Sequence, residues 1–161
     1  MGMLVARILK LHYVALGCVL LITGLVFSPG IGTGYLFDDQ SSVLPLHELR
    51  DSPEYFWALV FNDRSGPLGR PLSTATFALE QIWFHADAGL SQGISIGLHL
   101  LNGAILFAII RILLGHRAGS LPVAALVTVV WLLTPQKVST VLYIVQRMAM
   151  LAAFFTLLAL F

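Results

Sequence analysis

Long apolar runs without acidic or basic residues constrain this chain more than any other feature of its sequence. Leu11–Phe27 and Ile94–Ile110 contain no Asp, Glu, Lys or Arg. Two further runs, Leu121–Leu133 and Val138–Phe161, are interrupted only by Arg147. A helix needs about 20 such residues to cross the hydrocarbon core of a bilayer. In a chain that is 58% hydrophobic, these runs predict a membrane protein rather than a soluble domain.

The predicted architecture is an all-α membrane protein with about four transmembrane helices, forming one module over residues 1–161. The third span is short and needs flanking residues to complete a crossing. Between the first and second spans lies a long outer loop that contains short interfacial helices. The expected spans lie near 11–27, 92–112, 119–134 and 141–161, and the outer loop covers 28–91.

The first span has the basic start and apolar middle of a signal peptide. However, the run is long for a signal peptide, and the residues around Pro29 make a weak cleavage site. We therefore expect a retained signal anchor.

Charge predicts the orientation of the spans. Every acidic residue lies between the first two spans, from Asp38 to Asp87. Basic residues stand before the first span and around the turn between the second and third: Arg7, Lys10, Arg111 and Arg117. The positive-inside rule then places the N-terminus in the cytoplasm and the loop 28–91 in the periplasm of a bacterial inner membrane.

Two segments of the outer loop have the pattern of interfacial helices. One follows Ser52 and Pro53 and is rich in aromatic residues, and the other opens with Pro71. The second spaces apolar residues along one helical face: Leu72, Ala75, Leu79 and Trp83. Helices of this kind lie along a membrane surface or cover other helices. Glu80 on the second is expected to face solvent rather than to act in catalysis.

Two adjacent acids, Asp38 and Asp39, stand out in so apolar a chain. Adjacent carboxylates repel each other and are costly to bury. Either they lie in a solvated loop, or they form a catalytic or ligand-binding pair at the membrane surface.

A helix running from Pro135 would carry a polar stripe. Gln136, Thr140, Tyr143 and Arg147 recur at helical spacing and would share one face, with Lys137 near its upper end. An arginine at this depth in the membrane is costly unless it faces a cavity or a partner. Its planar guanidinium can donate two parallel hydrogen bonds to a phosphate. The alternative is that Lys137 and Arg147 snorkel to lipid headgroups.

Several site classes have little support. The single Cys18 excludes an intrachain disulfide, and the histidines show no metal-ligand spacing. His99 and Asn102, inside the second span, are expected to make hydrogen bonds between helices. The net charge of +1 without a basic cluster gives no reason to expect nucleic acid as a partner. The apolar spans make membrane lipid the expected partner.

Four segments in order carry a family likeness: "GYLFDDQSSV", "GRPLSTATFALEQIWF", "LHLLNGAILF" and "WLLTPQKVSTVLYIVQRMAMLAAFFTLLAL". Together they resemble the N-terminal membrane region of the transmembrane-and-tetratricopeptide-repeat O-mannosyltransferase-like proteins and their bacterial relatives. These proteins have the type C glycosyltransferase fold. The resemblance covers about Tyr35 to Phe161, and its last segment is the most specific.

The resemblance implies transfer of a sugar from a polyprenyl-phosphate donor to a hydroxyl acceptor on the outer face. It implies that Asp38 is the general base and that Asp39 positions the acceptor or a divalent cation. Whether such a cation is needed is left open. The resemblance implies that Arg147 holds the phosphate of the donor. The other candidate substrate-binding residues are Lys137, Gln136, Tyr143 and Arg70.

Members of this family have more spans, so we expect the chain to be a fragment or a truncated product that need not be active alone. The alternative reading is a small non-catalytic membrane subunit that packs on a larger membrane complex.

Overall fold

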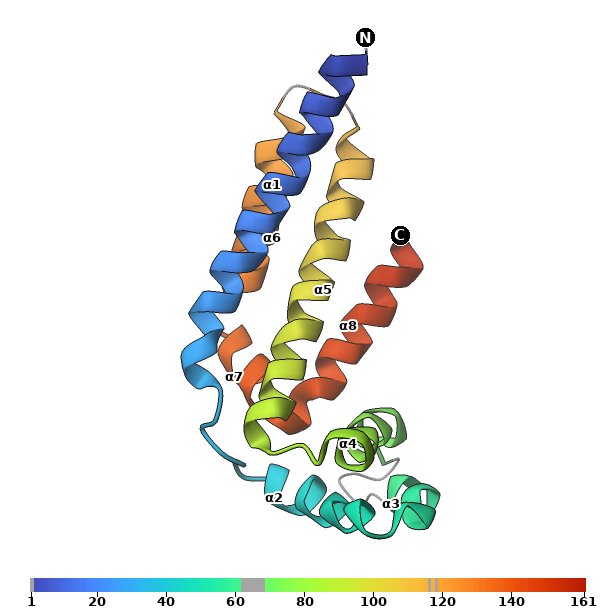
Figure 1. Cartoon of the computed structure of the whole chain (residues 1–161). Coiled ribbons are helices and arrows are strands. Elements are labelled where there is room, and N and C mark those ends of the chain that lie inside the picture. Colours follow the sequence, from blue (N-terminus) through green and yellow to red (C-terminus); the bar gives the residue numbers. More distant parts are fainter. Residues whose placement is uncertain (1, 62–68, 116, 118) are drawn as a thin grey trace.

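The computed structural model describes residues 2–61, 69–115, 117 and 119–161, with side chains described from Leu11 onward. All regular elements in these ranges are helical, which confirms the predicted all-α class. Four longer rods, α1 (Gly2–Phe27), α5 (Ala88–Leu114), α6 (Ser120–Leu133) and α8 (Arg147–Leu160), form the body of the molecule (Figure 1).

Two of the helices are long and apolar enough to cross a membrane, over Leu11–Gly30 and Ala88–Leu114. The exposed positions of α1 include Leu21 at 64% and Leu25 at 62%, so a large apolar surface faces outward. Apolar surface of this kind favours association with a membrane. The other two apolar helices, Ser120–Leu133 and Ile144–Leu160, are shorter.

Close packing holds the centre of the rods together. α5 packs against α1, α6 and α8, so it is the central helix (Figure 1). A Cβ on Gly103 would lie 2.7 Å from Cδ1 of Leu132, so glycine is what allows α5 and α6 to approach here. His99 Nε2 lies 3.0 Å from the carbonyl oxygen of Leu132, and Asn102 Nδ2 donates to the carbonyl of Met150 over 2.9 Å. Both are the predicted contacts between helices.

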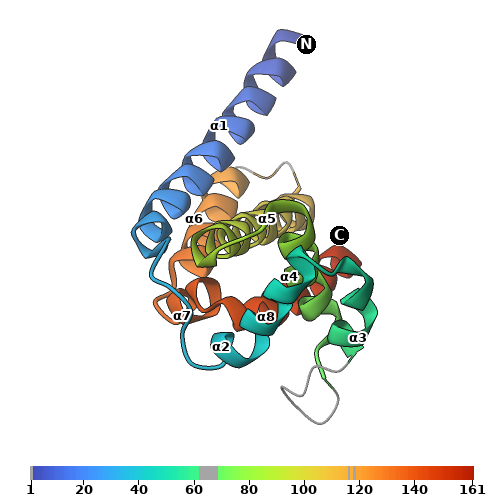
Figure 2. The ribbon, with the colours of Figure 1, turned by 60° about the horizontal axis from the view of Figure 1, so that its bottom comes forward.

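Short helices gather at one end of the rods, opposite the N-terminus (Figures 1 and 2). In chain order they are η1 (Ser28–Gly30), α2 (Asp39–Ser42), η2 (Leu44–Arg50), η3 (Pro53–Tyr55), α3 (Phe56–Phe61) and α4 (Pro71–Phe84). They have their own apolar core, in which Val43, Leu49 and Phe77 are almost fully buried. We call this group of short helices the cap, and it lies beside the starts of α5 and α8 (Figure 1).

The interfacial helix predicted to open with Pro71 is present as α4. Of its predicted apolar face, Leu72 and Trp83 are outward, at 55% and 65% exposed, while Ala75 and Leu79 are half-buried. The opposite face is buried and includes Glu80. The expectation that Glu80 faces solvent is therefore wrong, because Glu80 pairs with Arg147 of α8 and accepts a hydrogen bond from Ser91 of α5.

The helix predicted to run from Pro135 is broken. α7 (Lys137–Leu142) ends at Tyr143, whose backbone is extended, and η4 (Ile144–Gln146) leads into α8. Gln136 and Tyr143 therefore do not share one continuous helical face with Arg147. The amide hydrogens exposed by the break are bound by residues from the outer loop, as described below, and such bonds stabilise a helix interruption.

Candidate functional site

Asp39 is fully buried, and its carboxylate accepts a hydrogen bond from the backbone beside the break at Tyr143. Its Oδ1 accepts a hydrogen bond from the amide of Val145 over 2.7 Å, and its Oδ2 accepts from the amide of Leu36 over 3.1 Å. Burial raises the pKa of this carboxyl, although amides of Leu36, Val145 and Ile144 oppose that shift. The carboxylate lies at the start of η4 and α8, where unpaired amides attract an anion. Asp39 therefore joins the outer loop to α8.

Asp38 has the opposite environment. The residue is exposed, and its carboxylate makes no hydrogen bond or ion pair with the described residues. Its backbone amide donates to the hydroxyl of Tyr143 over 3.0 Å. The two aspartates are thus separated by burial: one is fixed inside the cap, and the other presents a carboxylate at the surface.

Gln92 also binds this loop, although nothing in the sequence pattern singled it out as a site residue. The side chain is fully buried near the start of α5. Its Oε1 accepts from the amide of Gly32 over 2.7 Å, while its Nε2 donates to Thr33 Oγ1 over 2.9 Å and to the carbonyl of Leu142 over 3.3 Å. Gln92 therefore links the loop, α5 and the end of α7.

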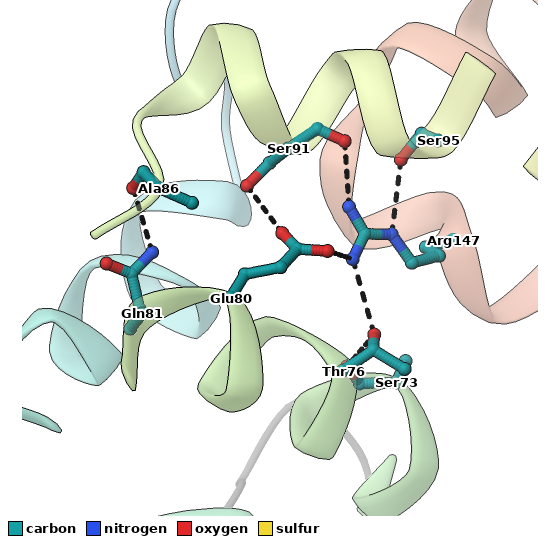
Figure 3. A network of polar contacts seen from close by, with 8 residues as sticks. All are labelled: Ser73, Thr76, Glu80, Gln81, Ala86, Ser91, Ser95 and Arg147. Atoms are coloured by element: carbon teal, nitrogen blue, oxygen red, sulfur yellow. Dashed lines mark hydrogen bonds and ion pairs between the residues drawn. The ribbon is translucent and has the colours of Figure 1, made fainter. Parts of the chain in front are cut away.

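Arg147 begins α8 and lies in a buried polar network (Figure 3). It forms an ion pair with Glu80, and the two side chains are only 1% and 7% exposed. The remaining donors of the guanidinium reach the carbonyl of Ser91 over 2.8 Å, Ser95 Oγ over 3.2 Å and Thr76 Oγ1 over 3.3 Å. All three nitrogens are engaged.

Glu80 receives a second contact from α5, because Ser91 Oγ donates to its Oε2 over 2.8 Å (Figure 3). Burial raises the pKa of Glu80, and the neighbouring Arg147 opposes that shift. The network thus joins α4, α5 and α8 through one ion pair. This ion pair was not predicted from the sequence. Glu80 is the only acid in α4, and a single acid in a largely apolar helix was a signal that could have pointed to a buried partner.

The remaining predicted site residues are spread over the cap and α7. Lys137 Nζ lies 4.7 Å from the ring centroid of Trp131, and Gln136 is an exposed residue at the N-cap of α7. Arg70 is half-buried at the N-cap of α4. The structure brings Asp38 and Tyr143 together, but no hydrogen bond or ion pair of the described residues joins Asp38 to Lys137, Arg147 or Arg70.

A divalent cation at the aspartate pair stays a prediction. Each oxygen of Asp39 accepts one backbone N–H group and keeps a second lone pair, and the carboxylate of Asp38 is exposed. Among the described residues there is no group of three or more His, Cys, Asp or Glu side chains that could hold a metal ion.

A comparison of the chain with family models, curated proteins and solved structures finds no match. The site contains the exposed carboxylate of Asp38, whose backbone is bonded to Tyr143. Lys137 and Gln136 stand at the start of α7.

Proposed function

We propose that this chain is the N-terminal module of an integral-membrane glycosyltransferase. It would transfer a sugar from a polyprenyl-phosphate donor to a hydroxyl acceptor on the outer face of the membrane. The observation that supports the proposal is the contrast within the aspartate pair. Asp39 is bonded within the fold, whereas the exposed carboxylate of Asp38 makes no hydrogen bond or ion pair with the described residues.

An unpaired, solvent-accessible carboxylate can serve as a general base. Asp38 would take the proton of the acceptor hydroxyl as that oxygen bonds to the anomeric carbon and the lipid phosphate leaves. The Tyr143 hydroxyl fixes the backbone at Asp38 and so limits where the carboxylate can point. Asp39 is then a positioning residue rather than a catalytic one.

The lipid-phosphate leaving group requires positive charge. Lys137 and Gln136 stand at the start of α7 on the same side of the helix break as Tyr143. We assign donor binding to them. Arg147, whose donors are engaged by the protein, contributes by fixing the start of α8 against α4 and α5.

The proposal includes a membrane arrangement. All four rods would cross or enter a bacterial inner membrane, with the N-terminus in the cytoplasm and the cap of short helices in the periplasm. Support comes from the apolar rods, from the acids gathered in residues 38–87 and from the position of the cap at one end of the rods.

The test is an Asp38→Asn variant of the complete protein, assayed in membranes for transfer of radiolabelled sugar from a polyprenyl-phosphate donor. Loss of a general base typically lowers the rate about 10²–10⁴-fold. Asp51→Asn is the matched control, because Asp51 is another exposed acid of the same loop. Wild-type turnover in Asp38→Asn membranes, at equal protein level, would remove Asp38 from the mechanism.

A second candidate function is a non-catalytic subunit of a larger membrane complex. The observation in its favour is that Asp39 and Arg147, to which the resemblance gives a catalytic and a substrate-binding role, both bond within the protein. Stoichiometric co-purification with other membrane proteins, combined with full activity of that complex when it carries Asp38→Asn, would support this candidate.

A further inference from the structure

A groove of about 260 Å³ lies between the start of α4 and the side of α8. On the α4 side its described lining begins with Arg70. On the α8 side the lining residues recur every three or four positions and so form one face: Met148, Leu151, Ala152 and Phe155. From Met148 to Phe155 the helix rises about 10 Å. The groove therefore runs for a short distance along the side of α8.

The two ends of this groove differ in chemistry. Along α8 it is lined by apolar side chains, with the small Ala152 leaving space between larger neighbours. At the start of α4 stands Arg70, whose guanidinium makes no hydrogen bond or ion pair with the described residues. No acidic residue lies in the first turn of α4 to neutralise it. The groove is thus apolar along its length, with Arg70 at its α4 end.

We propose that this groove binds one acyl chain of an anionic phospholipid, with the lipid phosphate at Arg70. A free anion would gain nothing from the apolar face, and an uncharged lipid would gain nothing from Arg70. The small volume suits a single unbranched chain better than a branched polyprenyl chain. The proposal rests on the membrane placement of α8 given above, but it does not involve Asp38.

The direction of the groove agrees with this ligand. α8 starts beside the cap and runs away from it (Figure 1). Arg70 is at the N-cap of α4 and Met148 is in the first turn of α8, whereas Phe155 comes about two turns later, toward the level of the hydrocarbon core in the proposed arrangement. An arginine at headgroup level pairs with phosphate through its planar fork. The bound lipid would then fill the space between the interfacial helix and α8, and would stabilise the cap against the rods.

The experiment is native mass spectrometry of the full chain released from nanodiscs of phosphatidylglycerol or phosphatidylcholine with identical acyl chains. We expect phosphatidylglycerol to be retained preferentially, and Arg70→Gln to lower that retention about tenfold, as expected for loss of a charge-assisted hydrogen bond. Arg117→Gln removes the same charge from an exposed arginine elsewhere and should retain lipid as the wild type does. Equal retention of the two lipids, or equal effects of the two substitutions, would overturn the proposal.

A second measurement uses the wild-type chain and so does not depend on a variant that folds. Phosphatidylglycerol with a photoreactive acyl chain should label Met148, Leu151 or Phe155 in preference to an exposed position on another side of α8, such as Leu160. Uniform labelling along α8 would reject the groove but keep the membrane placement. No labelling of α8 would reject the proposal together with that placement, and neither result depends on glycosyl transfer. Inorganic phosphate at the same concentration should not displace the lipid; displacement would show that the headgroup alone is bound.

Discussion

Asp39 shows how one buried carboxylate can connect a loop to a broken helix. Asp39→Ala leaves the buried amide of Val145 without an acceptor, at a cost of about 1–3 kcal/mol, and also removes the part-buried bond from the amide of Leu36. Asp39→Asn keeps one acceptor oxygen and should lose less. Thermal unfolding in detergent measures both variants. Equal stability of wild type and Asp39→Ala would show that the bonds contribute little.

The pH dependence of the same group gives an independent check. Burial raises the pKa of Asp39 above its ordinary value of 3.8, so the folded protein holds the proton more tightly than the unfolded chain does. The contribution of Asp39 to the free energy of unfolding is therefore largest below 3.8 and falls as the pH rises through the raised pKa. Asp39→Asn cannot titrate and should remove this part of the slope; an unchanged slope would assign it to another group.

Removing one partner of the Glu80–Arg147 pair should lower the free energy of unfolding strongly, whereas replacing both partners by apolar residues should lower it little. Removing one partner leaves a buried charge without compensation, which typically costs about 3–5 kcal/mol, so Glu80→Ala should be strongly destabilising. The double variant Glu80→Leu/Arg147→Met should recover most of that loss, because an apolar pair of similar volume needs no desolvation. Thermal unfolding of Glu80→Ala and of the double variant measures both effects. A double variant as unstable as Glu80→Ala would contradict this account of the pair.

Residue-level prediction from the sequence succeeded where spacing within one helix was enough. His99 and Asn102 were predicted to bond to neighbouring helices, and they do. The partner of Arg147 could not be predicted, because Glu80 lies 67 residues away and the packing of α4 on α5 and α8 brings it near. Asp38 and Asp39 are identical in local pattern, and only their tertiary contacts separate them.

At the scale of elements, the approach of α5 and α6 depends on Gly103. Gly103→Val should force Leu132 aside and destabilise the pair, by about 1–3 kcal/mol as in other overpacked cores. Gly97→Val is the matched control on the same helix, since a Cβ there meets nothing within 4 Å. Thermal unfolding in detergent compares them. If both glycine variants unfold at the same temperature, the close approach does not limit packing here.

The elements themselves were predicted to different degrees. Apolar length identified the helices at Leu11–Gly30 and Ala88–Leu114, and Pro71 correctly marked the start of α4. The break at Tyr143 was missed, because residues 135–150 contain no glycine or internal proline to signal it. What makes the break stable is tertiary: Asp39 binds the amides on one side, and Gln92 binds the Leu142 carbonyl on the other.

At the scale of the whole molecule, the account places the cap of short helices and the turn between α5 and α6 on opposite sides of a membrane. The two regions lie at opposite ends of the rods (Figure 1). Acidic residues gather in the cap region, while Arg111 and Arg117 flank the turn. Asp38 can act on an outer-face acceptor only if this orientation holds.

The most direct test is cysteine labelling of intact cells with a membrane-impermeant maleimide, in a Cys18→Ser background that removes the single native thiol. Ser41→Cys and Arg117→Cys introduce exposed thiols in the cap and in the turn. The account predicts that Ser41→Cys labels in intact cells and that Arg117→Cys labels only after permeabilisation. Labelling of both from the same side would show that α5 does not cross the membrane, and the reverse pattern would show that Asp38 faces the cytoplasm.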